Sequence, residues 1–175
     1  MEEKPSLARV ALKWGLISGV IFMVYTTIIN VAGLFTNQSM QWISLVIAIA
    51  VAIMAMRDYR ALNGGFMSYG EGVGLGTLLS VISGLVSITY SLIYTNFIDT
   101  TIRQQMLDNA REQLESRGMS DEQIDQAMQF TEKLQSPGLQ FMVGVLFSAI
   151  FGVLIALVVA AFLRRNKPTF PDFQN

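Results

Sequence analysis

The chain has 175 residues, of which 52% are hydrophobic and only 14% are charged, and its formal net charge is −1. It contains no cysteine and no histidine, which excludes disulfides, zinc sites built from these residues, and any mechanism with a histidine base or a cysteine nucleophile. The balanced charge argues against nucleic-acid binding, which needs a basic face.

The charged residues leave three long segments without any charge, at residues 14–56, 72–98 and 134–163. A membrane span needs about 20 apolar residues, so the second and third segments each fit one span and the first fits two. The polar run Thr36–Ser39 supplies the turn inside the first segment. The sequence therefore predicts four spans, at about 12–35, 40–57, 70–97 and 138–163.

The first predicted span carries a polar group at Asn30, close to Thr26 and Thr27. Such side chains in a span ordinarily make hydrogen bonds between helices. The alternative is that Asn30 contributes to the polar lining of a transport pathway.

Glu71 stands at the start of the third predicted span. An ionisable residue within a span is a functional candidate by default, which suggests an ion or proton site. However, Ser68 three residues earlier makes a capping-box pattern, and a carboxylate in the first helical turn suits the helix dipole. Glu71 is thus either a structural cap or an ion site. The glycines around it lack the ending of a phosphate-binding loop, so we predict no nucleotide cofactor.

Small residues recur every four positions in the third and fourth predicted spans. Because helices in lipid associate by close packing of small residues, we expect these two spans to form the tightest pair. Self-association through the same faces is the alternative. The helix-packing residues are Gly72, Gly76, Ser80 and Gly84 in the third span, and Gly144, Ser148, Gly152 and Ala156 in the fourth.

Residues 99–135 are polar, yet their apolar residues recur at helical spacing. We expect Gly118 to end a first helix, and Ser120 with Gln123 to begin a second one as a capping box. This predicts an amphipathic helical hairpin whose first helix continues the third span outward. Its apolar stripes either pack on each other or on the bilayer surface, or they form a docking or dimerisation surface.

The charges also predict an orientation. The hairpin segment contains four basic residues (Arg103, Arg111, Arg117 and Lys133) against eight acidic ones (Asp99, Asp108, Glu112, Glu115, Asp121, Glu122, Asp125 and Glu132). The remaining basic residues flank the other ends of the four spans. Because basic residues are enriched in cytoplasmic segments, we expect both termini to be cytoplasmic and the hairpin to be external.

The segment that opens the third span reads Asn63-Gly64-Gly65-Phe66-Met67-Ser68-Tyr69-Gly70-Glu71-Gly72. Together with the four spans and the long helical loop before the fourth, it resembles the domain-of-unknown-function family 4199 over residues 7–165. The resemblance implies a small bacterial membrane protein, typical of the Bacteroidetes, and it supplies no catalytic residues.

These features predict an all-α integral membrane four-helix bundle, a single domain over residues 1–175, with an extracytoplasmic hairpin between spans three and four. We expect it to lie in the bacterial inner membrane, to use no cofactor or metal, and not to be an enzyme. Its predicted partners are the lipid bilayer and, through residues 99–135, an envelope protein or a second copy of the chain. A small channel or transporter with a polar path near Glu71 and Asn30 is the alternative.

Overall fold

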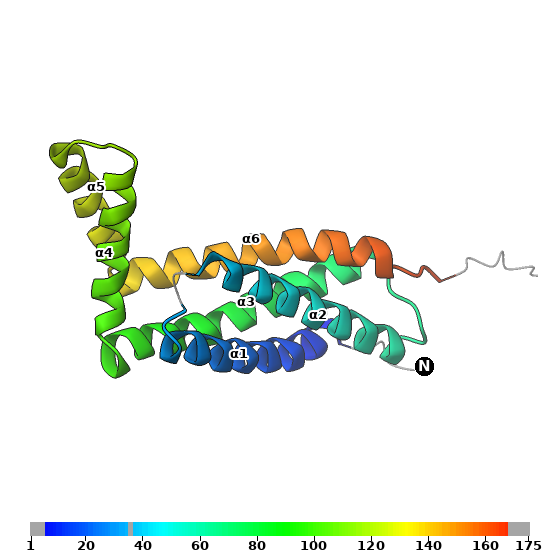
Figure 1. The fold of residues 1–175 in the computed structure, drawn as a ribbon. Coiled ribbons are helices and arrows are strands. Elements are labelled where there is room, and N and C mark those ends of the chain that lie inside the picture. Colours follow the sequence, from blue (N-terminus) through cyan, green and yellow to red (C-terminus); the bar gives the residue numbers. More distant parts are fainter. Residues whose placement is uncertain (1–5, 35–36, 168–175) are drawn as a thin grey trace, which may run out of the picture.

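A computed structural model of the chain describes residues 6–34 and 37–167. These residues form six α-helices and no strand, which confirms the predicted all-helical class. In Figure 1, α1, α2, α3 and α6 form an elongated bundle, and α4 and α5 stand across one end of it. The elements are α1 (Leu7–Val31), α2 (Gln38–Leu62), α3 (Tyr69–Ile93), the π-helical segment η1 (Tyr94–Ile98), α4 (Thr101–Ser116), α5 (Asp121–Leu134) and α6 (Pro137–Leu163).

The four bundle helices are long and apolar enough to cross a membrane, with η1 counted as part of the third. This agrees with the number of spans predicted from the charge pattern. Large apolar side chains such as Val46, Phe147 and Val158 are exposed on the outside of the bundle. A surface of this kind is unfavourable in water and suits contact with lipid, so the chain has the features of a membrane protein.

The helices extend beyond the apolar stretches at their ends because polar residues cap them. The Ser6 hydroxyl accepts from the Arg9 amide at 3.4 Å, so α1 begins well before residue 12. It ends before Gly33, whose φ of +66° suits glycine. Asn37 caps α2 by accepting from the Ser39 amide at 2.9 Å, and the predicted stretch 40–57 lies inside this longer helix. Thr36 of the predicted turn lies outside the described residues.

The first hairpin helix does not continue α3, so this prediction was wrong. After the wide turn of η1, Asp99 has an extended backbone with φ −135° and ψ 90°. Its carboxylate accepts from the Thr101 amide at 3.1 Å and from the Thr101 hydroxyl at 2.6 Å. A side chain that binds nearby backbone amides in this way competes with the helix, and α4 starts again in a new direction (Figure 1).

Small residues face each other along α3 and α6, which are antiparallel. A methyl group added at Gly72 would lie 2.8 Å from Ala160 Cβ, and one at Gly76 would lie 2.5 Å from Ala156 Cβ. The facing pairs repeat every four residues, forward along α3 and backward along α6. All eight predicted packing residues therefore lie on this contact. The remaining facing pairs are Ser80 with Gly152, Gly84 with Ser148, and Ile88 with Gly144.

The opposite side of α3 packs against α1, where methyl groups added at Gly15 and Gly19 would each lie 2.7 Å from an α3 side chain. The helix α2 packs less completely. Its buried residues all lie between Val51 and Tyr59, whereas Trp42 near its start is 68% exposed. The hydrophobic core is therefore concentrated toward the end of the bundle that holds the N-terminus of α1 and the C-terminus of α6.

We call this end the tail end and the opposite one the hairpin end. At the tail end, Lys13 of α1 forms an ion pair of 2.8 Å with Asp58 of α2. The Trp14 indole N–H donates to the same carboxylate oxygen at 2.7 Å. Two donors from successive residues on one carboxylate fix the start of α1 against the last turns of α2.

Candidate functional site

The segment Asn63–Gly72 forms the tight connection between α2 and α3 at the tail end. Gly64 and Gly65 have φ of +65° and +87°, which L side chains rarely adopt. The Asn63 side-chain amide donates to the Phe66 carbonyl at 3.0 Å and closes the turn. Met67, which follows, is fully buried. Gly64 and Gly65 thus serve the backbone of a turn.

Glu71 holds the start of α3 in place. The Ser68 hydroxyl accepts from the Glu71 amide at 3.3 Å, and Glu71 Oε2 accepts from the Ser68 amide at 2.7 Å, which confirms the predicted capping box. The other carboxylate oxygen accepts from the Tyr59 hydroxyl at 3.1 Å. Because Tyr59 is buried in α2, Glu71 links the last turns of α2 to the first turn of α3.

The segment after α6 folds back onto this connection. Met67 and Arg165 form an antiparallel β-bridge through two backbone hydrogen bonds, of 2.9 Å and 2.8 Å. The Arg165 guanidinium lies 6.0 Å from the centre of the Phe66 ring. In addition, Arg60 donates to the Leu163 carbonyl at 3.2 Å. The segment Asn63–Gly72 is therefore the place where α2, α3 and the chain after α6 are joined.

These elements border an open polar cavity of about 370 Å³, which we call the Glu71 cavity. One carboxylate, two cationic side chains and several amide and hydroxyl groups surround it, a set suited to binding a small polar molecule. In the described part of the chain, no three acidic side chains gather as metal ligands would. The lining residues are Asn63, Phe66, Met67, Ser68, Glu71, Arg165, Asn166 and Lys167.

Asn30 lies far from this cavity, in the last turn of α1 at the hairpin end. It is half-buried, and its carbonyl accepts from the Gly33 amide at 3.0 Å. Ser83 bonds to Ser18 and Tyr90 to Thr27, so α1 and α3 run parallel. Glu71 is then level with the start of α1, roughly 24 residues before Asn30, or about 36 Å at 1.5 Å per residue. The structure does not bring the two predicted site residues together.

Sequence reasoning missed a second cavity, in the middle of the bundle. It has a volume of about 210 Å³ and is lined by serines from three helices. Ser83 donates to Ser18 across the contact of α1 and α3 at 2.9 Å, and both are buried. The spacing of the α3 serines, at positions 80, 83 and 87, marks one helix face and was the available sequence signal. We call this the serine cavity; its hydroxyls belong to Ser18, Ser80, Ser83, Ser87 and Ser148.

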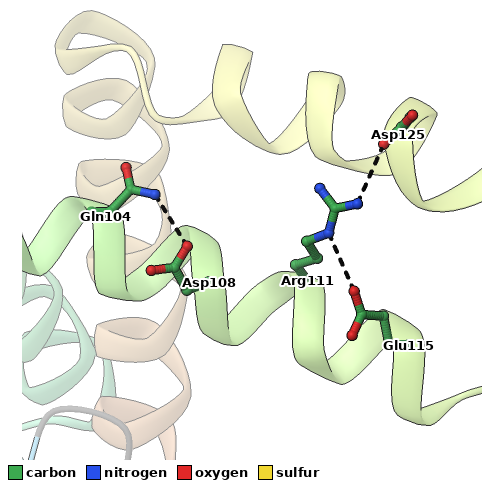
Figure 2. Close-up of polar contacts among 5 residues, drawn as sticks. All are labelled: Gln104, Asp108, Arg111, Glu115 and Asp125. Atoms are coloured by element: carbon green, nitrogen blue, oxygen red, sulfur yellow. Dashed lines mark hydrogen bonds and ion pairs between the residues drawn. The ribbon is translucent and has the colours of Figure 1, made fainter. Parts of the chain in front are cut away.

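The two hairpin helices are joined by charged side chains, as Figure 2 shows. Arg111 of α4 contacts Glu115 at 3.2 Å in its own helix and Asp125 of α5 at 3.9 Å. Gln104 donates to Asp108 at 3.1 Å along α4. Ile102 is the one buried residue of α4, and Ile124 is the one buried residue of α5. Other apolar residues of the two helices remain exposed. The exposed large apolar residues of the hairpin helices are Met106, Phe130 and Leu134.

One protein-family model matches most of the chain. The model of the family described as "Protein of unknown function (DUF4199)" matches residues 13–165, a stretch that includes the whole Asn63–Gly72 segment and the hairpin. No match was found among curated proteins or among solved structures. The chain belongs to the DUF4199 family.

Proposed function

We propose that this member of the family is a non-enzymatic envelope-accessory or interaction protein that presents its α4–α5 hairpin outside the bacterial inner membrane. One observation carries the proposal. The hairpin stands across the end of the bundle (Figure 1), and its large apolar side chains are not all used inside the molecule. Phe130 is 64% exposed, and Met106 and Leu134 are exposed as well, among the many charged residues of the hairpin. Exposed apolar groups with a polar rim are typical of interaction surfaces.

The distribution of charge supports the orientation. Apart from the four basic residues of the hairpin, all described lysines and arginines lie at the tail end, while the hairpin has four more acidic than basic residues. A tail end in the cytoplasm satisfies the positive-inside rule. The tail-end basic residues among those described are Arg9, Lys13, Arg57, Arg60, Arg164, Arg165 and Lys167.

The same charge favours one kind of partner. Two copies of the acidic hairpin would repel each other, so we favour an envelope protein with a basic, partly apolar surface over a second copy. Within the hairpin, Arg111 already neutralises part of the charge of Glu115 and Asp125. The acids elsewhere on α4 and α5 therefore dominate the field that a partner meets.

Crosslinking in intact membranes tests the proposal. A photoreactive phenylalanine analogue replaces Phe130 in one variant and Leu62, 59% exposed at the tail end, in the matched control. We expect a discrete heavier product from the Phe130 variant only, and its mass distinguishes an added partner from a second 19.4 kDa chain. No product at Phe130, or the same product from both variants, would refute the hairpin as an interaction surface.

The alternative, a small channel or transporter, has a different observation in its favour. The serine cavity places several hydroxyl groups in the middle of the bundle, between the ends that hold Glu71 and Asn30. Ion or solute flux through reconstituted protein, reduced by Glu71→Gln and by Ser83→Val, would support this function. Protein that passes nothing from a broad panel of ions and small solutes would exclude it.

A further inference from the structure

Two bends of the chain lie at the hairpin end of the bundle, and residues near both of them line one cavity. One is the break at Asp99 between η1 and α4, and the other is the link at Gln135–Ser136 between α5 and α6. This third cavity has a volume of about 250 Å³, and we call it the elbow cavity. It is separate from the Glu71 cavity and the serine cavity. Its polar walls are formed by Ser91, Thr95, Asn96, Arg103, Gln135 and Gln140.

The wide turn of η1 shapes one wall of this cavity. Thr95 donates to the Ser91 carbonyl at 2.9 Å, and Asn96 donates to the Leu92 carbonyl at 2.8 Å. The two side chains thus donate to backbone carbonyls next to a π-helical turn, where the regular pattern of helical hydrogen bonds changes. These bonds also hold the two side chains in one place, so this wall is preformed.

Gln135 provides an acceptor without a partner. Its backbone amide closes α5 on the Thr131 carbonyl at 3.0 Å. Its side-chain oxygen is buried and receives no hydrogen bond from any described residue. Buried acceptors are rarely left in this state, because losing water without gaining a donor is unfavourable. Gln135 also lines the elbow cavity, so a molecule bound there could supply the missing donor.

Arg103 provides donors without a partner ion. Among the described residues it forms no ion pair, although its segment contains eight acids. In contrast, Arg111, two turns further along α4, is engaged by Glu115 and Asp125. Arg103 lines the elbow cavity, and a guanidinium suits the oxygens of a phosphate, which it can bind through two parallel hydrogen bonds.

The position of the elbow cavity points to a lipid. It extends from the region where the third candidate span ends at Ile98 and the fourth begins at Pro137 inward to Ile88 and Gly144, and lipid headgroups lie at the ends of membrane spans. Its remaining walls are apolar, with Ile88, Leu92 and Met106 among them. Leu139, next to the lining residue Gln140 on α6, is an exposed apolar side chain. A ligand here meets polar groups at one end and a lipid-facing surface at the other.

We propose that the elbow cavity binds the headgroup of an anionic phospholipid with a free hydroxyl, of the phosphatidylglycerol type. The phosphate lies on the Arg103 guanidinium, and a headgroup hydroxyl donates to the side-chain oxygen of Gln135. The acyl chains lie against the exposed start of α6. The proposal rests on the four helices spanning a membrane, and it does not depend on which protein binds the hairpin.

Short-chain phospholipids, added to the detergent-solubilised full chain and counted by native mass spectrometry, test this proposal. We expect phosphatidylglycerol to bind at least about tenfold more tightly than the zwitterionic phosphatidylcholine. Arg103→Gln should remove this preference, and Arg117→Gln, the same change at the far end of α4, should keep it. Equal binding of the two lipids, or equal loss in both variants, overturns the site.

Two further comparisons identify the ligand. Gln135→Leu should weaken phosphatidylglycerol but leave phosphatidylmethanol, which has the same charge and no hydroxyl, unchanged. Equal weakening of both lipids overturns the role of Gln135. Glycerol phosphate without acyl chains should bind far more weakly, and equal binding would make the ligand a soluble phosphate and overturn the lipid. If Arg103→Gln does not fold, Arg103→Lys replaces it; unchanged lipid preference in that variant contradicts recognition by the guanidinium fork.

Discussion

Moving one methyl group across the α3–α6 contact should be tolerated, although each half of the exchange destabilises the bundle. The change is Gly76→Ala together with Ala156→Gly. In the native chain, a methyl group at position 76 would lie 2.5 Å from Ala156 Cβ. Carbon atoms pack best at about 3.5–4.0 Å, so Gly76→Ala alone must push the helices about 1 Å apart.

The magnitudes follow from packing and helix propensity. Overpacking costs about 1–3 kcal/mol, and replacing glycine by alanine in a helix returns up to about 1 kcal/mol, so Gly76→Ala should lower the free energy of unfolding by about 1 kcal/mol. Ala156→Gly alone should lower it by about 1–2 kcal/mol through lost contact and propensity. In the double variant the propensity changes cancel. The new methyl group lies 3.4 Å from Cα of residue 156 and 3.3 Å from Met56 Cε, the flexible end of a side chain that can shift by a few tenths of an ångström. We expect near-native stability and a coupling energy of about 2–3 kcal/mol.

Reversible unfolding in mixed detergent micelles, followed by helical circular dichroism, measures these free energies. Gly74→Ala is the matched control, because a methyl group there meets only Leu7 Cδ1 at 4.0 Å. It should stabilise α3 by about 0.5–1 kcal/mol. Additive effects of the two single substitutions would refute direct packing of Gly76 on Ala156.

Three further outcomes are expected. Asp58→Asn should lower the free energy of unfolding by about 1 kcal/mol, because it removes the ion pair with α1 and weakens the Trp14 bond; no loss in the same micelle assay would contradict this. Glu71→Ala should cost about 0.5–2 kcal/mol as a lost cap, and Glu71→Gln clearly less; equal losses would assign the effect to charge. In intact cells, an impermeant thiol reagent should label Glu112→Cys but not Leu62→Cys; the reverse pattern would invert the proposed orientation.

Much of the helical architecture could be predicted from the sequence because lipid imposes simple rules. A membrane span must be apolar over a fixed length, so the absence of charge over residues 14–56, 72–98 and 134–163 was enough to count four candidate helices. Capping is equally local, since the Ser68 and Glu71 groups that bond to each other are three residues apart. Both rules involve neighbours along the chain.

The break between α3 and α4 could not be read in this way. The uncharged run ends at Asp99, and the residues after it have helical spacing, so a continuous helix satisfied the pattern. In the structure the helix is interrupted where the Asp99 carboxylate accepts a hydrogen bond from the Thr101 amide. Such a local bond competes with helical hydrogen bonds of similar strength, so the spacing of residues does not predict which of them forms. The change of direction there creates the elbow cavity, which brings Arg103 and Gln135 together although they are distant in sequence.

Spacing within single helices was enough to predict the number of apolar helices, the helix starts after Ser68 and Ser120, and the faces of small residues. The folded structure alone shows that serines from α1, α3 and α6 surround one cavity, and that Arg165 reaches Met67. These contacts depend on how the helices are shifted along one another. The side chains of two or three helices together set that shift. Along α3 and α6, for example, it is set by glycines that face alanines.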